Sequence, residues 1–200
     1  QEALDGGASG VQVGTLFAYA QESGIAPEIR REVLDRVVRD DVDVLTDGRA
    51  SPTGFPFKIV QLEYSNSSKQ QYEARKRVCD LGYLRTAYRR PDGRLDYRCA
   101  AEPVDTYVKK GGCVEDTVGR KCLCNALMAD IGMAQVREGG ELERPIVTSG
   151  DDLMRINRFL HGRTEYGARD VVEYLLEGVV VPEKAAIAAP RKELTGAGAD

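Results

Sequence analysis

The sequence lacks any run approaching the ~20 apolar residues of a transmembrane helix. Its N-terminus also lacks a basic segment followed by an apolar one, which is the pattern of an export signal. Neither sign of charge dominates, because 28 basic side chains stand against 32 acidic ones and the formal net charge is −4. These absences give no reason to expect a membrane or a nucleic acid as a partner, and they predict a cytoplasmic protein.

No methionine lies near the start of the chain, which begins at Gln1 and has its three methionines at positions 128, 133 and 154. We therefore expect it to be the C-terminal piece of a longer polypeptide. Its 200 residues, 42% of them hydrophobic and 30% charged, have an ordinary globular composition and are enough to bury a core.

The most informative stretch is residues 10–17, GVQVGTLF. Apolar residues alternate with Gln12 and no charge interrupts them, a pattern that predicts a short buried strand. The strand ends at Gly14, which has no Cβ and lets an anion approach the backbone N–H groups, and at Thr15, whose hydroxyl can donate a further hydrogen bond. The stretch therefore predicts either a phosphate-binding strand end or simply a buried strand and a turn.

Residues 3–17, ALDGGASGVQVGTLF, resemble the last barrel unit of the nitronate monooxygenase family, formerly called 2-nitropropane dioxygenases. Ser9 stands where the family usually has Asp. The resemblance implies an α/β fold, in which this strand is the eighth of a TIM (β/α)8 barrel and the helix after it closes the barrel. It also implies that Gly14 and Thr15 contact the phosphate of FMN, with Gln12 directed toward the flavin.

The same resemblance implies a function. The chain would be the C-terminal part of an FMN-dependent monooxygenase that oxidises a small alkyl nitronate with O2. Flavin-dependent enoyl reductases share this barrel and the Gly-Thr strand end, and they are an alternative. The family's catalytic base is a histidine on an earlier strand; His161, the one histidine here, does not match that motif, so no catalytic residue is assigned.

A parallel barrel strand needs neighbours on both edges, and an unpaired apolar edge must pair with something. We therefore expect either the missing N-terminal barrel segment or a second copy of the chain as a partner. The predicted organisation is a flavin-binding barrel end over residues 1–60, a mainly helical, cysteine-containing extension over 61–148, C-terminal helices over 149–180 that pack back on the barrel, and a mobile tail over 181–200.

Local patterns predict the remaining elements. Helices are expected over residues 27–39, 68–78, 150–160 and 167–176, and from Cys122 onward by the spacing of Leu123, Leu127 and Ile131. A strand is expected over 42–46, an extended segment before 60, and a loose hairpin around the turn RRPDGR at 89–94. Ser149 and Asp152 have the spacing of a capping box.

Residues 51–60, SPTGFPFKIV, resemble the family's segment after the last barrel helix. That segment has a Thr-Gly-x-Pro motif followed by a basic residue, which here corresponds to Thr53, Gly54, Pro56 and Lys58. The alternative is a plain surface loop. Two further stretches, YRCAAEPVDTYVKKGG and EDTVGRKCLCNALMADIG, resemble the C-terminal extension of longer, actinobacterial-type members, for which no function is carried over.

All five cysteines lie between positions 79 and 124, at Cys79, Cys99, Cys113, Cys122 and Cys124. An odd number without an export signal argues against a complete disulfide framework. The pair at 122 and 124 opens a predicted helix beside two basic residues, where the thiol pKa values should fall and favour metal binding or redox reactivity.

Four of the sulfurs, from Cys79, Cys99, Cys122 and Cys124, could hold zinc or an iron–sulfur cluster. The sequence has no CxxC motif, however, and cysteine is often simply a small buried apolar residue. The cluster therefore predicts either unconnected thiols or a metal site. A metal site would make the chain a non-enzymatic structural or interaction module, which is the second functional hypothesis.

Overall fold

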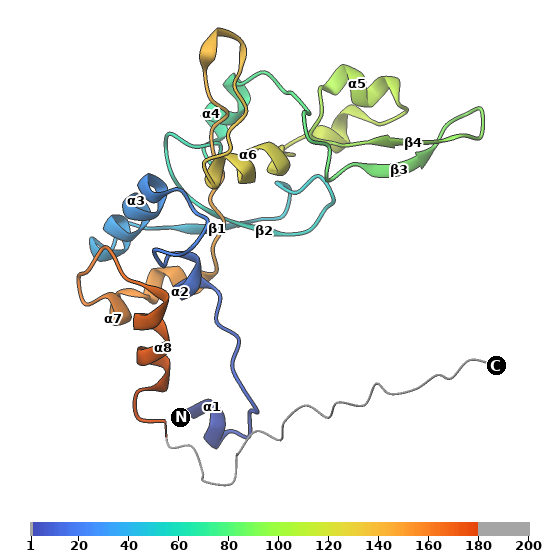
Figure 1. Ribbon diagram of the computed structural model, residues 1–200. Coiled ribbons are helices and arrows are strands. Elements are labelled where there is room, and N and C mark those ends of the chain that lie inside the picture. The colour runs from blue at the N-terminus through green and yellow to red at the C-terminus, as the bar shows by residue number, and fades with distance from the viewer. Residues whose placement is uncertain (1, 180–200) are drawn as a thin grey trace, which may run out of the picture.

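The computed structural model describes residues 2–179, and the fold is mixed α and β with two small sheets (Figure 1). The α-helices are α1 (Glu2–Asp5), α2 (Thr15–Ala18), α3 (Pro27–Val38), α4 (Lys69–Ala74), α5 (Val104–Lys109), α6 (Leu123–Asp130), α7 (Asn157–Leu160) and α8 (Ala168–Leu176). The strands are β1 (Val44–Asp47), β2 (Phe57–Val60), β3 (Thr86–Arg89) and β4 (Leu95–Arg98). Short 3-10 turns occupy Val114–Thr117, Glu138–Gly140 and Asp151–Arg155.

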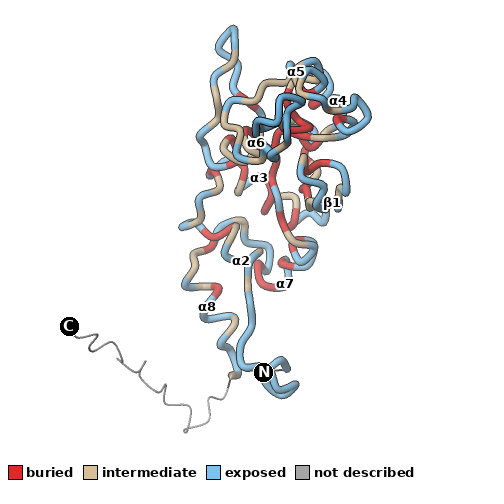
Figure 2. The backbone as a smooth tube through the Cα atoms, turned by 90° about the vertical axis from the view of Figure 1, so that its right-hand side faces the viewer, coloured by how far each residue is buried: buried red, intermediate tan, exposed pale blue. Residues whose placement is uncertain are grey.

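The predicted strand over residues 10–17 is wrong. Residues 10–14 have no regular secondary structure, and the chain turns into α2 at Thr15. Figure 2 shows an exposed segment leading from the N-terminal end up to α2. Within this segment Val11 is 64% exposed. A strand persists only when a neighbour satisfies its backbone hydrogen bonds, and no strand within residues 2–179 pairs with this segment.

The helix after this segment forms as predicted. Pro27 occupies the first turn of α3, where its missing N–H costs nothing, and Glu28 complements the positive helix end. Ile29, Val33 and Val37 lie on one buried face. This face is the side of α3 that meets the rest of the core.

Strands β1 and β2 are antiparallel, with Val44 opposite Val60 and Asp47 opposite Phe57. β2 in turn contacts the chain after α6, since the Val60 N–H donates to the Val147 carbonyl at 2.9 Å. The two predicted extended segments are therefore confirmed, and they form a hairpin-like pair. Among residues 2–179 the sheets are antiparallel pairs and no barrel is present.

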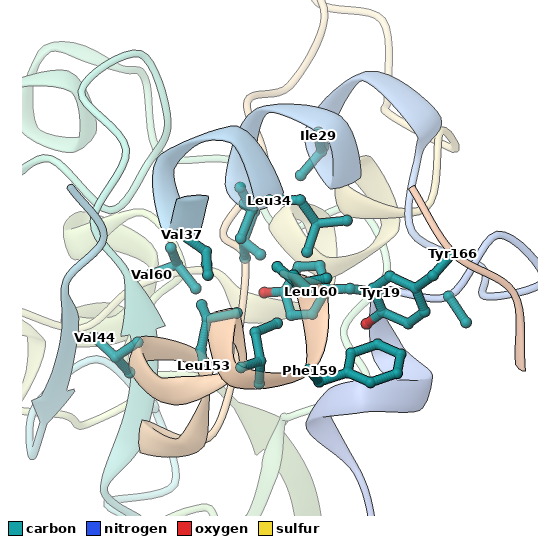
Figure 3. Close-up of a cluster of buried hydrophobic side chains, with 14 of the residues drawn as sticks. Tyr19, Ile29, Leu34, Val37, Val44, Val60, Leu153, Phe159, Leu160 and Tyr166 are labelled. Atoms are coloured by element: carbon teal, nitrogen blue, oxygen red, sulfur yellow. The ribbon is translucent and has the colours of Figure 1, made fainter. Parts of the chain in front are cut away.

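The main core joins the beginning and the end of the described chain. Figure 3 shows apolar side chains from α3, β1 and β2 packed against those of the C-terminal segment. Phe159 and Tyr166 meet edge to face, with ring centroids 4.8 Å apart. The residues over 149–179 thus pack on elements from the first 62 residues, although they are far apart in sequence.

The middle of the chain forms the other end of the molecule (Figure 1). Ser68 caps α4, its Oγ accepting from the Gln71 N–H at 3.4 Å. The helix begins where it was predicted but ends at Ala74 rather than near 78. The hairpin around the RRPDGR turn is confirmed as β3 and β4. α6 packs on β2 through a second buried cluster, which consists of Ala50, Ile59, Leu123, Ala126 and Ile146.

The predicted helix over 150–160 is split into the Asp151–Arg155 turn and α7. The expected capping box is also wrong, because Gly150 is the residue that precedes the turn and no side chain caps it. α8 begins after Gly167, whose N–H donates to Asp170 at 2.7 Å, and ends at Leu176, as predicted.

The predicted tail over 181–200 lies outside the described residues. Within the described part, none of the helices has the length and apolar character needed to cross a bilayer.

Candidate functional site

A pocket of about 280 Å³ lies where the N-terminal segment meets the C-terminal helices. One wall comes from residues 12–16. These include Gly14 and Thr15, which were predicted to contact the FMN phosphate, and Gln12, which was predicted to point toward the flavin. The opposite wall comes from the Asp151–Arg155 turn, α7 and α8. The structure therefore brings the predicted residues together in one pocket, although the predicted strand is absent.

Contacts with the C-terminal segment fix the position of α2. The Tyr166 hydroxyl donates to the Leu16 carbonyl at 2.6 Å, and the Tyr166 carbonyl accepts from the Gln21 N–H at 2.9 Å. Within α2, the Ala18 N–H donates to the Gly14 carbonyl. The orientation of Gly14 and Thr15 thus depends on residues 150 positions away in sequence.

The wall formed by residues 12–16 has hydrogen-bond donors to spare. The Thr15 hydroxyl and the backbone N–H groups of Thr15, Leu16 and Phe17 have no partner in the part of the chain that is described. A Cβ added to Gly14 would meet no atom within 4 Å, so the space beside this backbone is open. Open backbone with free N–H groups suits a negatively charged ligand.

Sequence reasoning missed the basic residues of the opposite wall, Arg155 and Arg158. A signal was present, because the spacing of Leu153, Ile156 and Leu160 is that of one apolar helix face, which leaves positions 155 and 158 on another face. That spacing does not show which other segment the exposed face meets. Only the packing of this segment beside α2 places the two arginines at the pocket.

The four predicted metal-binding thiols come from three separate segments and reach one neighbourhood. Cys99 and Cys122 are buried in a small cluster with Ala101. Cys79 and Cys124 both lie close enough to Cys99 and Cys122 to raise the pKa values of these two thiols. Cys113, by contrast, is exposed and is not among their neighbours. None of the cysteines over residues 2–179 forms a disulfide, and no three Cys, His, Asp or Glu side chains there form a ready set of metal ligands.

The expected fall in thiol pKa is wrong for Cys122. Although Cys122 precedes α6, burial raises its pKa to about 12, against the opposing effects of the Asn125 N–H and Arg75. Burial likewise raises the pKa of Cys99. Removal from water outweighs the helix end here, so these two thiols stay protonated at neutral pH.

The other residues singled out in the sequence lie apart from this pocket or play structural roles. His161 ends α7 in the left-handed conformation, with φ of 49°. The Thr53 hydroxyl shares a hydrogen bond with Ser51 at 2.8 Å, and Lys58 pairs with Asp151. Lys58 lies within β2 and thus joins this strand to the C-terminal segment, whereas Thr53 bonds within its own loop.

No protein-family model, curated protein or solved structure matches this chain at a significant level.

Proposed function

We propose that this chain is the C-terminal part of an FMN-dependent oxidoreductase of the nitronate monooxygenase type. In this proposal Gly14 and Thr15 hold part of the FMN phosphate, and Gln12 points toward the flavin. The observation that supports this proposal is the position of the three residues on one wall of a single pocket. Open space beside Gly14 and unpaired donors at Thr15 suit the approach of a phosphate group.

The residues of this chain would bind and orient the cofactor. The backbone N–H groups at the start of α2 and the Thr15 hydroxyl would donate to phosphate oxygens, and charge-assisted bonds of this kind are about twice as strong as neutral ones. When bound, FMN supplies the redox chemistry of the proposed reaction, the oxidation of a small alkyl nitronate by O2. The catalytic base comes from outside this chain in the proposal.

The exposed segment before α2 supports the proposed partner. Val11 has most of its surface exposed, and residues 10–14 make no strand pairing within the described chain. An extended apolar segment of this kind gains backbone hydrogen bonds when a neighbouring strand is added. In the proposal, that strand belongs to the N-terminal part of the same enzyme or to a second copy of the chain.

Substituting Gly14→Val tests the phosphate site. Gly14 has φ of −112° and nothing near its missing Cβ, so the larger side chain fits the chain itself and fills only the space that the phosphate would use. We expect at least a tenfold loss of FMN affinity, measured by quenching of flavin fluorescence, with an unchanged melting temperature. Thr15→Ala should weaken FMN binding by about tenfold through loss of one donor.

Gly10→Val is the matched control, because Gly10 also has open space around it but does not line the pocket. FMN affinity should be the same in this variant as in the unmodified chain. Equal FMN binding by the Gly14→Val variant, or no FMN binding by the unmodified chain, would overturn the proposed flavin function.

The gathered thiols favour a second candidate, a structural or interaction module held together by a thiolate-bound metal. Four thiols from Cys79, Cys99, Cys122 and Cys124 reach one neighbourhood, although they do not form a ligand set as they lie. Metal analysis and absorbance of the purified chain separate the candidates. About one zinc or an iron–sulfur chromophore per chain, unfolding on chelation and no flavin support the module, whereas yellow, metal-free protein supports the enzyme.

A further inference from the structure

Two unpaired arginines face the phosphate-binding wall. Arg155 ends the Asp151–Arg155 turn and Arg158 lies in α7, and both line the pocket with Thr15. Neither guanidinium has a hydrogen-bond or ion-pair partner over residues 2–179. Most other arginines of the described chain are engaged, as in the bidentate pair of Arg75 with Glu143.

The local fold explains why both arginines point away from the core. Leu153, Ile156 and Phe159 are buried, and they alternate with the two arginines along the turn and α7. Residues three apart on a helical segment lie on the same side. Packing of the apolar residues therefore leaves both arginines exposed, and both also line the pocket.

The charge of the pocket favours an anion. Asp152 also lines it, so its ionised side chains are two guanidinium groups and one carboxylate, an excess of one positive charge. The Asp152 carboxylate acts against an anion, while the Thr15 hydroxyl adds an uncharged donor. Guanidinium groups match phosphate oxygens with two parallel hydrogen bonds, which makes arginine better suited to a phosphate than to a monovalent halide.

We infer that Arg155 and Arg158 bind the phosphate monoester of the ligand held at Thr15, so that the C-terminal segment forms the second wall of that site. The identity of the ligand as FMN rests on the proposed function, whereas the phosphate chemistry rests on the arginines and the pocket. The site then distinguishes FMN from riboflavin, which has the same ring but no phosphate.

The test uses the full chain and its variants Arg155→Gln, Arg158→Gln and the double substitution. Arg49→Gln is the matched control, because Arg49 is also exposed and has no side-chain partner but lies away from the pocket. Inorganic phosphate is titrated by thermal shift, and FMN and riboflavin are titrated by fluorescence quenching, each at two salt concentrations.

We expect each single substitution to lower FMN affinity on the order of tenfold, and the double substitution to lower it on the order of a hundredfold. Riboflavin affinity should not change, and stabilisation by inorganic phosphate should disappear in the double variant. The salt dependence of FMN binding should also decrease, because fewer charges take part. The Arg49→Gln variant should match the unmodified chain throughout.

The outcomes separate this inference from the proposed function. Unchanged phosphate and FMN binding in the double variant overturns the arginine site and leaves the flavin proposal standing. Equal losses for FMN and riboflavin also overturn it, because the arginines would then act on the fold. Phosphate binding that depends on the arginines, without FMN binding by the unmodified chain, supports the anion site and overturns the flavin proposal. No response to phosphate or FMN overturns both.

Discussion

Arg75 and Glu143 form a bidentate ion pair, in which Nε and Nη2 of the arginine each lie 2.8 Å from a carboxylate oxygen. The Glu143 side chain is only 2% exposed. Arg137 also donates to this carboxylate, and Asn66 Nδ2 donates to Oε1 at 2.8 Å. One buried carboxylate thus ties α4, the loop before it and the segment after α6 together.

Removing this carboxylate should destabilise the fold strongly. Glu143→Ala leaves the Arg75 guanidinium partly buried without its carboxylate partner and leaves Arg137 with Asp80 alone. We expect a loss of ~3–5 kcal/mol in the free energy of unfolding, measured by urea denaturation. Glu73→Ala is the control, because the Lys69–Glu73 pair is exposed and should contribute less than about 1 kcal/mol. Similar losses in the two variants would contradict the role of the network.

The same carboxylate predicts a loss of stability in acid. Burial raises the pKa of Glu143, but hydrogen bonds from Arg75 and Arg137 outweigh burial and hold the pKa below its ordinary value of 4.5. A carboxyl group with a lowered folded pKa contributes stability above its unfolded pKa and loses it as the pH falls through the folded pKa. The unmodified chain should therefore lose stability more steeply below about pH 4.5 than Glu143→Gln, in urea titrations at stepped pH.

Asp130 predicts a pH dependence of the opposite sign. It is 5% exposed, its Oδ1 has no hydrogen-bond partner in the described chain, and burial raises its pKa from 3.8 to about 7. When folding raises the pKa of a group, that group contributes its full stability at pH values below its pKa in the unfolded state. The contribution is lost as the pH rises through the pKa in the folded state. The chain should lose stability between about pH 4 and pH 7 through this group.

Asp130→Asn removes the charge and should abolish this loss. A pKa rise of this size corresponds to a gain of at most about 4 kcal/mol for the variant above pH 7, at ~1.36 kcal/mol per pKa unit. Urea denaturation of both proteins from pH 4 to pH 8 measures the difference. If the free energies of unfolding of the two proteins changed with pH in parallel, ionisation of Asp130 would not destabilise the fold, and the prediction would be wrong.

Gly112 should tolerate no side chain. A Cβ at this position would lie 2.1 Å from Cε1 of the Tyr107 ring, whose hydroxyl bonds Asp116 at 3.2 Å. We expect Gly112→Ala to displace the ring and to destabilise the chain by ~1–3 kcal/mol in thermal unfolding. Gly48→Ala, where no atom lies within 4 Å, is the control and should change stability much less.

Thiol reactivity should follow burial. Cys113 is exposed, whereas Cys99 and Cys122 are buried and have raised pKa values, so they contain little thiolate at pH 8. Timed alkylation with iodoacetamide, mapped by mass spectrometry, should modify Cys113 first and these two last. If Cys122 were alkylated as fast as Cys113, the residue that precedes α6 would not be buried as the structure has it.

Local sequence patterns were sufficient to predict an element where the interactions that form it lie within the same short segment. The amphipathic spacing and Pro27 predicted α3, the Pro-Asp-Gly turn predicted the β3–β4 hairpin, and Ser68 predicted the start of α4. Residues 10–14 failed as a strand because a strand also needs a partner. The predicted fall in the Cys122 pKa was wrong because burial raises this pKa more than the helix start lowers it, and burial depends on tertiary packing.

The sequence by itself determined the periodicities, the turns and the Gly-Thr step at positions 14 and 15, because these depend on neighbouring residues. Only the tertiary structure decided that Arg155 and Arg158 meet that step across one pocket, and that four thiols from three segments come near each other. These relationships join residues far apart in the chain, and they arise from the packing of the apolar faces, which no local pattern specifies.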